Sequence, residues 1–149
     1  MGLDMYLEGH KFNSSYYANG YLKPRPTCPD GFEIKSTTLD LGYWRKHPNL
    51  HGYIINTYAE GEDECQKIYL DDEQLEDIAD AIENNRLPHT EGFFFGKSEW
   101  HEEEKAKNAE KFRKASEWLK GQYPISSAAM PLHKYRLDDW SYVIYRASW

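Results

Sequence analysis

Hydrophobic and polar residues alternate near both ends of the chain. Leu3, Met5 and Leu7 are separated by polar or amphipathic neighbours, and the same period of two recurs from Trp140 to Ala147. A period of two places successive side chains on opposite faces of a strand that is buried on one side. We therefore expect a first and a last β-strand in these segments. A further strand is predicted over about Phe32 to Leu41, at an exposed or edge position.

Three other segments show the helical period. Asp71 can cap a helix, with Gln74 in the capping-box position and an apolar face that follows and ends at the Asn84-Asn85 pair. A long helix is predicted from Ser98 to about Lys120. A shorter helix is expected to start at Pro48, because proline suits the first turn, although Gly52 is unfavourable inside it.

The remaining segments complete the expected order of elements. Residues 12–31 are rich in Asn, Ser, Gly and Pro and predict a long irregular loop, and 66–70 predict a short strand. Phe93 to Phe95, between two glycines, predict a buried strand or wall. The order β–β–α–β–α–(β)–α–β indicates an α+β fold, with about three helices and a small, mostly antiparallel sheet in a single domain over residues 1–149.

Composition then limits the kinds of partner. The formal net charge is −7, which argues against binding to duplex nucleic acid, because that binding depends on phosphate neutralisation by Lys and Arg. Twelve Tyr and five Trp are too many for one core to hide, so several are expected to be half-exposed at interfaces or ligand sites. With Trp149 at the end of the chain, this surplus predicts a homo-oligomer.

The cysteines and the hydropathy pattern predict the compartment. Cys28 and Cys65 lack the spacing of a metal site or a disulfide framework, so both are expected to be free thiols. No run of residues has the length and hydropathy of a membrane span or the opening of a signal peptide. We expect a cytoplasmic protein that does not contact a membrane.

The run Tyr43-Trp44-Arg45-Lys46-His47 is the most informative candidate site. Aromatic rings can stack on a base, and a guanidinium can donate two parallel hydrogen bonds to phosphate oxygens. The run therefore predicts a ligand site for a nucleotide-like molecule. The alternative interpretation is an ordinary helix entrance, in which Trp44 is anchored in the core and the charged side chains are solvated.

Other candidate residues are fewer and less specific. His47 and His51 are four residues apart, as zinc ligands on a helix would be, but a third ligand is missing and Pro48 interrupts the pair, so no metal is predicted. The ring of Phe94 is a candidate to face a ligand, with core packing as the alternative. No nucleophile motif or carboxylate pair stands out, so no catalytic residue or cofactor is predicted.

Several segments together resemble a known family. They are Gly2-Leu3-Asp4-Met5-Tyr6-Leu7, the central Gly42 to Lys46, the segment Leu87 to Gly96 with its three phenylalanines, and the final Ser148-Trp149. In this order they resemble a family of small proteins from tailed bacteriophages and prophages, from which Pro48 and Asn49 depart. The resemblance implies a phage origin, and with it the host bacterial cytoplasm. Small phage proteins often antagonise host defence, and one class sequesters signalling nucleotides between subunits by aromatic stacking and Arg or Lys contacts.

These observations lead to one expectation and two alternatives. The expected function is that of a phage accessory protein that binds, and so sequesters, a small nucleotide-like antiviral signal. The expected ligand-binding residues are Tyr43, Trp44, Arg45, Lys46, His47, His51, Phe94 and Trp149. The alternatives are a protein inhibitor of a host defence factor, and a hydrolase of a signalling nucleotide.

Overall fold

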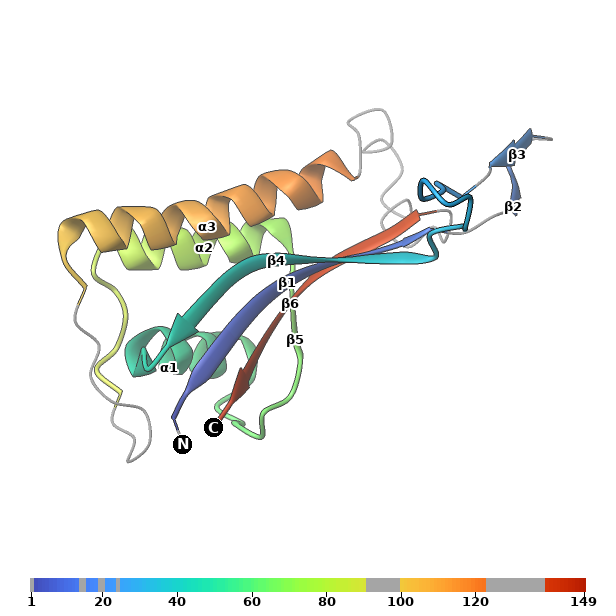
Figure 1. Ribbon diagram of the computed structural model, residues 1–149. Coiled ribbons are helices and arrows are strands. Elements are labelled where there is room, and N and C mark those ends of the chain that lie inside the picture. The colour runs from blue at the N-terminus through green and yellow to red at the C-terminus, as the bar shows by residue number, and fades with distance from the viewer. Residues whose placement is uncertain (1, 14–15, 19–20, 24, 91–99, 123–138) are drawn as a thin grey trace.

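Three helices cover one side of an antiparallel sheet in the computed structural model of the chain (Figure 1). The structure describes residues 2–13, 16–18, 21–23, 25–90, 100–122 and 139–149. Within them the main sheet has the strand order β4-β1-β6-β5, and all neighbouring strands are antiparallel. The α+β fold class with three helices is therefore as predicted.

The two predicted terminal strands form the centre of this sheet. β1 (Asp4–Asn13) pairs with β6 (Asp139–Ser148) along its whole length, and both are longer than the alternation predicts. A β-bulge between Leu7 and Glu8 shifts the register of β1 against its other neighbour, β4. The two chain ends thus lie side by side in space, as Figure 1 shows.

The predicted second strand is displaced along the chain. β4 runs over Ser36–Arg45 instead of Phe32 to Leu41, and it includes most of the Tyr43 to His47 run. The prediction failed because the stretch after Leu41 is aromatic and basic, which hides its alternation, while pairing with β1 fixes its extended form. The irregular loop predicted over 12–31 is also partly wrong. It contains the end of β1 and a two-stranded hairpin, β2 (Tyr16–Ala18) and β3 (Tyr21–Lys23).

The first helix is confirmed, and its glycine has a packing role. α1 runs over Pro48–Tyr58, with proline in the first turn. A Cβ added to Gly52 would lie 2.1 Å from Thr90 Oγ1, so the segment before residue 91 packs directly on the helix backbone. The Thr90 backbone N–H also donates to Asn49 Oδ1 at 2.9 Å. Close approach of two chain segments therefore outweighs the poor helix propensity of glycine.

The second and third helices pack against each other. α2 (Asp72–Glu83) follows the short strand β5 (Ile68–Leu70) and carries the capping box predicted at its start. α3 (Glu102–Gly121) begins later than expected, and the predicted start at Ser98 and the predicted strand over 93–95 lie outside the described residues. Arg113 of α3 binds three carboxylates of α2, with distances of 2.5 to 2.9 Å to Glu76, Asp80 and Glu83.

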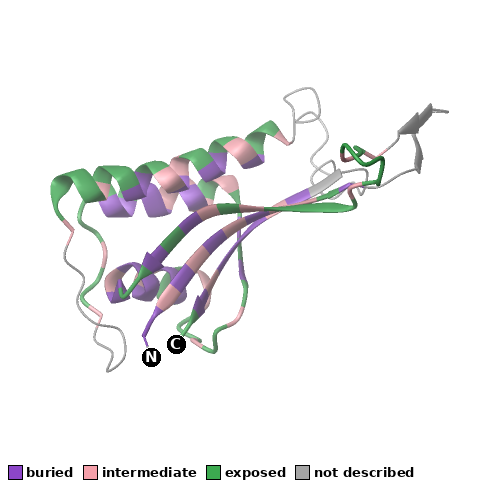
Figure 2. Cartoon of the chain, viewed as in Figure 1, coloured by how far each residue is buried: buried purple, intermediate pink, exposed green. Residues whose placement is uncertain are grey.

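The core lies between the helices and the sheet. Buried residues gather where the two layers meet, as the purple segments of Figure 2 show. Leu3, just before β1, and Met5 and Leu7 of β1 are completely buried there, as are Val143 and Tyr145 of β6. The other face of the sheet has no described helix against it (Figure 1). The strand pairing places the alternate residues of β1, β4 and β6, such as Tyr6, on this open face.

Candidate functional site

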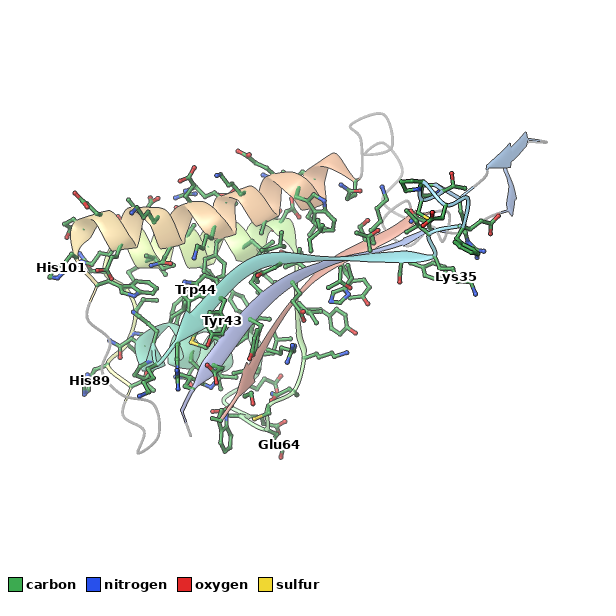
Figure 3. The ribbon with its side chains drawn as sticks, in the orientation of Figure 1. Lys35, Tyr43, Trp44, Glu64, His89 and His101 are labelled. Atoms are coloured by element: carbon green, nitrogen blue, oxygen red, sulfur yellow. The ribbon has the colours of Figure 1, made fainter. Side chains whose placement is uncertain are left out.

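The pleat of β4 divides the predicted Tyr43 to His47 run between two sides of the sheet. Trp44 lies opposite Met5 on the covered side, is 6% exposed, and stacks on Phe112 with ring centroids 5.1 Å apart. Its Nε1–H donates to Asn108 Oδ1 at 2.6 Å. The tryptophan is thus held by the core. Tyr43 and Arg45 alternate with it and lie on the open face, where both side chains are exposed. Figure 3 labels Tyr43 and Trp44.

On the open face, Tyr43 and Arg45 meet at Asp4 of β1. The Tyr43 hydroxyl donates to Asp4 Oδ1 at 2.5 Å, and this hydrogen bond raises the pKa of the phenol. Arg45 Nε lies 3.8 Å from the same oxygen, and its side chain is 62% exposed. Asp4 therefore orients the phenol and keeps a guanidinium beside it that is still accessible to an anion.

Cross-strand pairing extends this cluster with two residues that sequence reasoning missed. Tyr43 is opposite Tyr6, and Tyr6 is opposite Arg146, so the three form one row across β4, β1 and β6. The Tyr6 and Tyr43 ring centroids are 5.4 Å apart, and the Arg146 guanidinium lies 4.3 Å from the Tyr6 centroid. Arg146 also donates to Glu8 at 3.0 Å. We call Tyr6, Tyr43, Arg45, Arg146 and Asp4 the tyrosine–arginine surface.

Aromatic rings continue along the same open face. His10 stacks on Tyr142 with centroids 5.1 Å apart and an interplanar angle of 13°. Tyr142 in turn contacts Tyr69 of the edge strand β5, which is 63% exposed. An aromatic surface of this kind, with guanidinium groups at one end, is suited to stacking and to cation–π contacts.

Lys46 and His47 turn the chain from β4 into α1. Lys46 has a φ of 55°, and its N–H donates to the Leu3 carbonyl, which anchors the turn to β1. His47 caps α1 by accepting a hydrogen bond at Nδ1 from the Leu50 N–H at 3.1 Å. Burial lowers its pKa from 6.5 to about 4, so the imidazole is neutral at pH 7. This ring packs on Trp100, with centroids 3.5 Å apart.

His51 and Trp149 meet at a different point, through Asp63. His51 is 1% exposed, and its Nε2 lies 2.9 Å from Asp63 Oδ2. Trp149 Nε1–H donates to the second oxygen of the same carboxylate at 3.2 Å. Because an ionised carboxylate only accepts, the His51 Nε2–H donates to Asp63, and Nδ1 forms a hydrogen bond with the Tyr145 hydroxyl at 2.6 Å. This chain of hydrogen bonds ties the end of β6 to α1.

The seven predicted ligand residues that the structure describes therefore do not lie in one cluster. The open face brings Tyr43 and Arg45 together, Asp63 joins His51 to Trp149, and Trp44 and His47 are buried in separate contacts. Phe94 lies outside the described residues. In the described part of the chain, no group of three or more His, Cys, Asp or Glu side chains is placed to hold a metal ion.

Little in the sequence indicates that Tyr6 and Arg146 belong to a site. Tyr6 and Arg146 are 140 residues apart, and each is one polar position in an alternating strand. Their proximity follows from the register of β1 against β6, which a single sequence does not specify. Cys28 and Cys65, by contrast, are the free thiols expected.

Comparisons with known protein families, with curated proteins and with solved structures give no match. Among the helices the structure describes, none has the length and hydropathy needed to cross a membrane. The site must therefore be interpreted from its own chemistry.

Proposed function

We propose that the tyrosine–arginine surface binds a small nucleotide-like ligand. The observation that supports this most directly is the row Tyr43–Tyr6–Arg146 across three strands. Arg45 lies beside this row, two residues after Tyr43 on the same face of β4. The phenol rings offer stacking surfaces for a base. The exposed Arg45 guanidinium can donate two parallel hydrogen bonds to phosphate oxygens. Asp4 fixes the phenol of Tyr43 before a ligand arrives, which lowers the entropy lost on binding.

Sequestration suits this site better than hydrolysis. A hydrolase needs a base that can reach the substrate, usually a histidine or a carboxylate. The His51–Asp63 pair has suitable hydrogen bonds, but His51 is 1% exposed and its other nitrogen bonds the buried Tyr145. This pair is therefore better suited to holding the fold together than to chemistry. Asp4, the carboxylate of the surface itself, accepts from the Tyr43 hydroxyl and lies 3.8 Å from Arg45 Nε, so it is engaged in positioning these two side chains. The proposed function is accordingly that of a phage accessory protein that withholds an antiviral signalling nucleotide in the host cytoplasm.

Exposed aromatic residues support the proposed homo-oligomer. Phe12, Tyr43 and Tyr69 are 42%, 46% and 63% exposed and lie on β1, β4 and β5, with alternation that directs them to the open face. Large exposed apolar surface of this kind is typical of a face that meets another protein surface. A second copy that covers the far part of this face would leave the tyrosine–arginine surface at its edge. Light scattering at tens of micromolar tests this, and a monomer would contradict the oligomer.

A binding screen tests the function itself. A thermal-shift screen against cyclic and linear nucleotides, including ADP-ribose derivatives, should identify a ligand that raises the melting temperature. Calorimetric titration of that ligand should then show affinity roughly tenfold to 150-fold weaker in Arg45→Ala, because a charge-assisted hydrogen bond contributes about 1.5–3 kcal/mol. The matched control is Lys114→Ala, which removes a cation of α3 that is 72% exposed, against 62% for Arg45.

The same experiment separates the alternatives. Ligand recovered intact after heat denaturation of the complex supports sequestration, whereas recovered products support a hydrolase. No binding by any nucleotide would contradict both and favour the protein inhibitor. Equal affinities of Arg45→Ala and Lys114→Ala would contradict the proposed surface.

A further inference from the structure

A separate pocket of about 450 Å³ lies where the end of α2, the start of α3 and the start of α1 meet. It is distinct from the tyrosine–arginine surface, and none of its lining residues belongs to that surface. His101, at the amino-terminal end of α3 in Figure 3, is at its margin. Small-molecule sites in proteins usually have volumes of about 300–1,000 Å³, so this pocket is large enough for one small ligand.

The pocket has an aromatic and apolar wall. Trp100, Ile82 and His47 line it, and the His47 and Trp100 ring centroids are 3.5 Å apart. Burial keeps the His47 imidazole neutral at pH 7, and its Nδ1 is committed to the Leu50 N–H. The Trp100 ring is therefore supported from one side, and it is half-buried. A flat ring that is fixed in this way is a good surface for stacking by another flat ring.

The polar wall of the pocket consists of two side-chain amides and a lysine that is paired with a glutamate. Asn49 and Asn85 both line the pocket. Lys105 Nζ donates to Asn85 Oδ1 at 2.6 Å and to Glu102 at 3.2 Å. Glu102 compensates the lysine charge, so this wall attracts a phosphate much less than a lone lysine would. Asn49 Oδ1 accepts from the Thr90 N–H, and Asn85 Oδ1 accepts from Lys105. The Asn85 Nδ2 group can still donate to an acceptor on the edge of a nucleobase.

We propose that this pocket binds an uncharged nucleobase, with its ring on Trp100 and its polar edge on the Asn85 amide. The proposal goes beyond the function assigned to the tyrosine–arginine surface, because it concerns a second site whose ligand needs no phosphate. A nucleoside and the corresponding monophosphate should bind it with similar affinity. At the tyrosine–arginine surface the phosphate should instead decide the affinity.

The indole N–H signals of the five tryptophans provide a site-specific test. Trp100→Phe assigns the signal of Trp100 in a ¹H–¹⁵N NMR spectrum by its loss. Titration with adenosine, guanosine, cytidine and uridine should shift this signal for at least one nucleoside at millimolar concentration or below. The signal of Trp149, which donates to Asp63 and does not line the pocket, should stay unchanged. The absence of a Trp100 shift with all four nucleosides would overturn the proposal.

Two neighbouring asparagines provide the matched variants. Asn85 has a φ of 54°, so Asn85→Gly removes the amide without backbone strain, while Asn84→Ala removes an amide that does not line the pocket. Asn85→Gly should weaken nucleoside binding roughly fivefold to a hundredfold, because one such base-edge contact contributes about 1–3 kcal/mol. Asn84→Ala and Arg45→Ala should bind the nucleoside as the wild type does.

The outcomes distinguish the two sites. Equal nucleoside affinity in Asn85→Gly and Asn84→Ala would overturn the pocket proposal and leave the tyrosine–arginine surface untouched. Loss of nucleoside binding in Arg45→Ala would also overturn it, because the ligand would then lie on the open face. Tighter binding of the monophosphate than of the nucleoside at the Trp100 signal would contradict the uncharged ligand.

Discussion

Neighbouring residues of one strand show how differently the two faces of this sheet are built. Trp44 stacks on Phe112 and donates a hydrogen bond to Asn108, while Tyr43, one residue earlier, is 46% exposed and donates its hydroxyl proton to Asp4. Both are aromatic residues with a polar group, and both have that group satisfied. The covered face uses the ring as packing volume, and the open face leaves the ring accessible. The residue type alone therefore does not show whether an aromatic side chain packs in the core or can contact a ligand. The face of the sheet toward which the side chain points decides this.

The largest effect is expected where the covered face loses volume. Trp44→Ala removes a ring in contact with Phe112 and leaves the Asn108 amide without its indole partner. The free energy of unfolding should fall by about 3–5 kcal/mol, the usual range for a buried large aromatic residue. Urea denaturation followed by circular dichroism measures it. A loss below about 1 kcal/mol would show that Trp44 is not part of the core.

Acid should lower the free energy of unfolding, because His47 is buried on the covered side of the sheet and must be protonated there. Its folded pKa of about 4 lies below the ordinary 6.5, so the folded state favours the neutral ring. The stabilisation is complete above pH 6.5 and is lost as the pH falls toward 4. In His47→Asn the cap is kept by a good capping residue, but the titration is removed. The wild type should therefore lose more stability between pH 7 and pH 4.5 than His47→Asn does, by about 2–3 kcal/mol.

Urea midpoints of both proteins at several pH values provide this measurement. The difference between the two proteins, not the stability of either, is the informative quantity, because the substitution also removes the contact with Trp100. Parallel pH curves for the two proteins would show that His47 is not the titrating group.

The smallest effect on stability is expected on the open face. Tyr43→Ala removes an exposed ring and one hydrogen bond to Asp4. The free energy of unfolding should therefore fall by only a small fraction of the loss expected for Trp44→Ala. Binding of the screened nucleotide should nevertheless weaken, because the ring is one of its stacking surfaces. Tyr43→Phe keeps the ring and loses only the hydroxyl, so it should retain most of the affinity. A Tyr43→Ala protein that unfolds as easily as Trp44→Ala would remove the distinction between the faces.

The sequence predicted an element correctly where interactions within that segment decide its structure. The capping box of Asp71 and Gln74 satisfies backbone donors within four residues, and α2 begins as predicted. Proline at position 48 likewise marks the start of α1, and the alternation around Met5 identifies the first strand. The β4 boundaries were wrong because that strand is stabilised by its pairing with β1 and not by its own pattern.

The residues of the candidate site were harder to predict than the helix starts, because the site is formed by residues far apart in the sequence. The sequence singled out Tyr43 and Arg45, since aromatic and basic residues next to each other suit a nucleotide. It could not separate them from Trp44, because the direction of a side chain on a strand depends on which face the helices cover. Nor could it pair Tyr6 with Arg146, or Trp100 with His47.

By itself, the sequence determined the α+β class, the start sites of α1 and α2 and the chemistry available along β4. These follow from periodicity, capping and composition, which act over a few residues. Only the tertiary structure decided which of these side chains share a surface. Strand register and helix packing join residues that are tens of residues apart in the chain, and no local interaction specifies those distances.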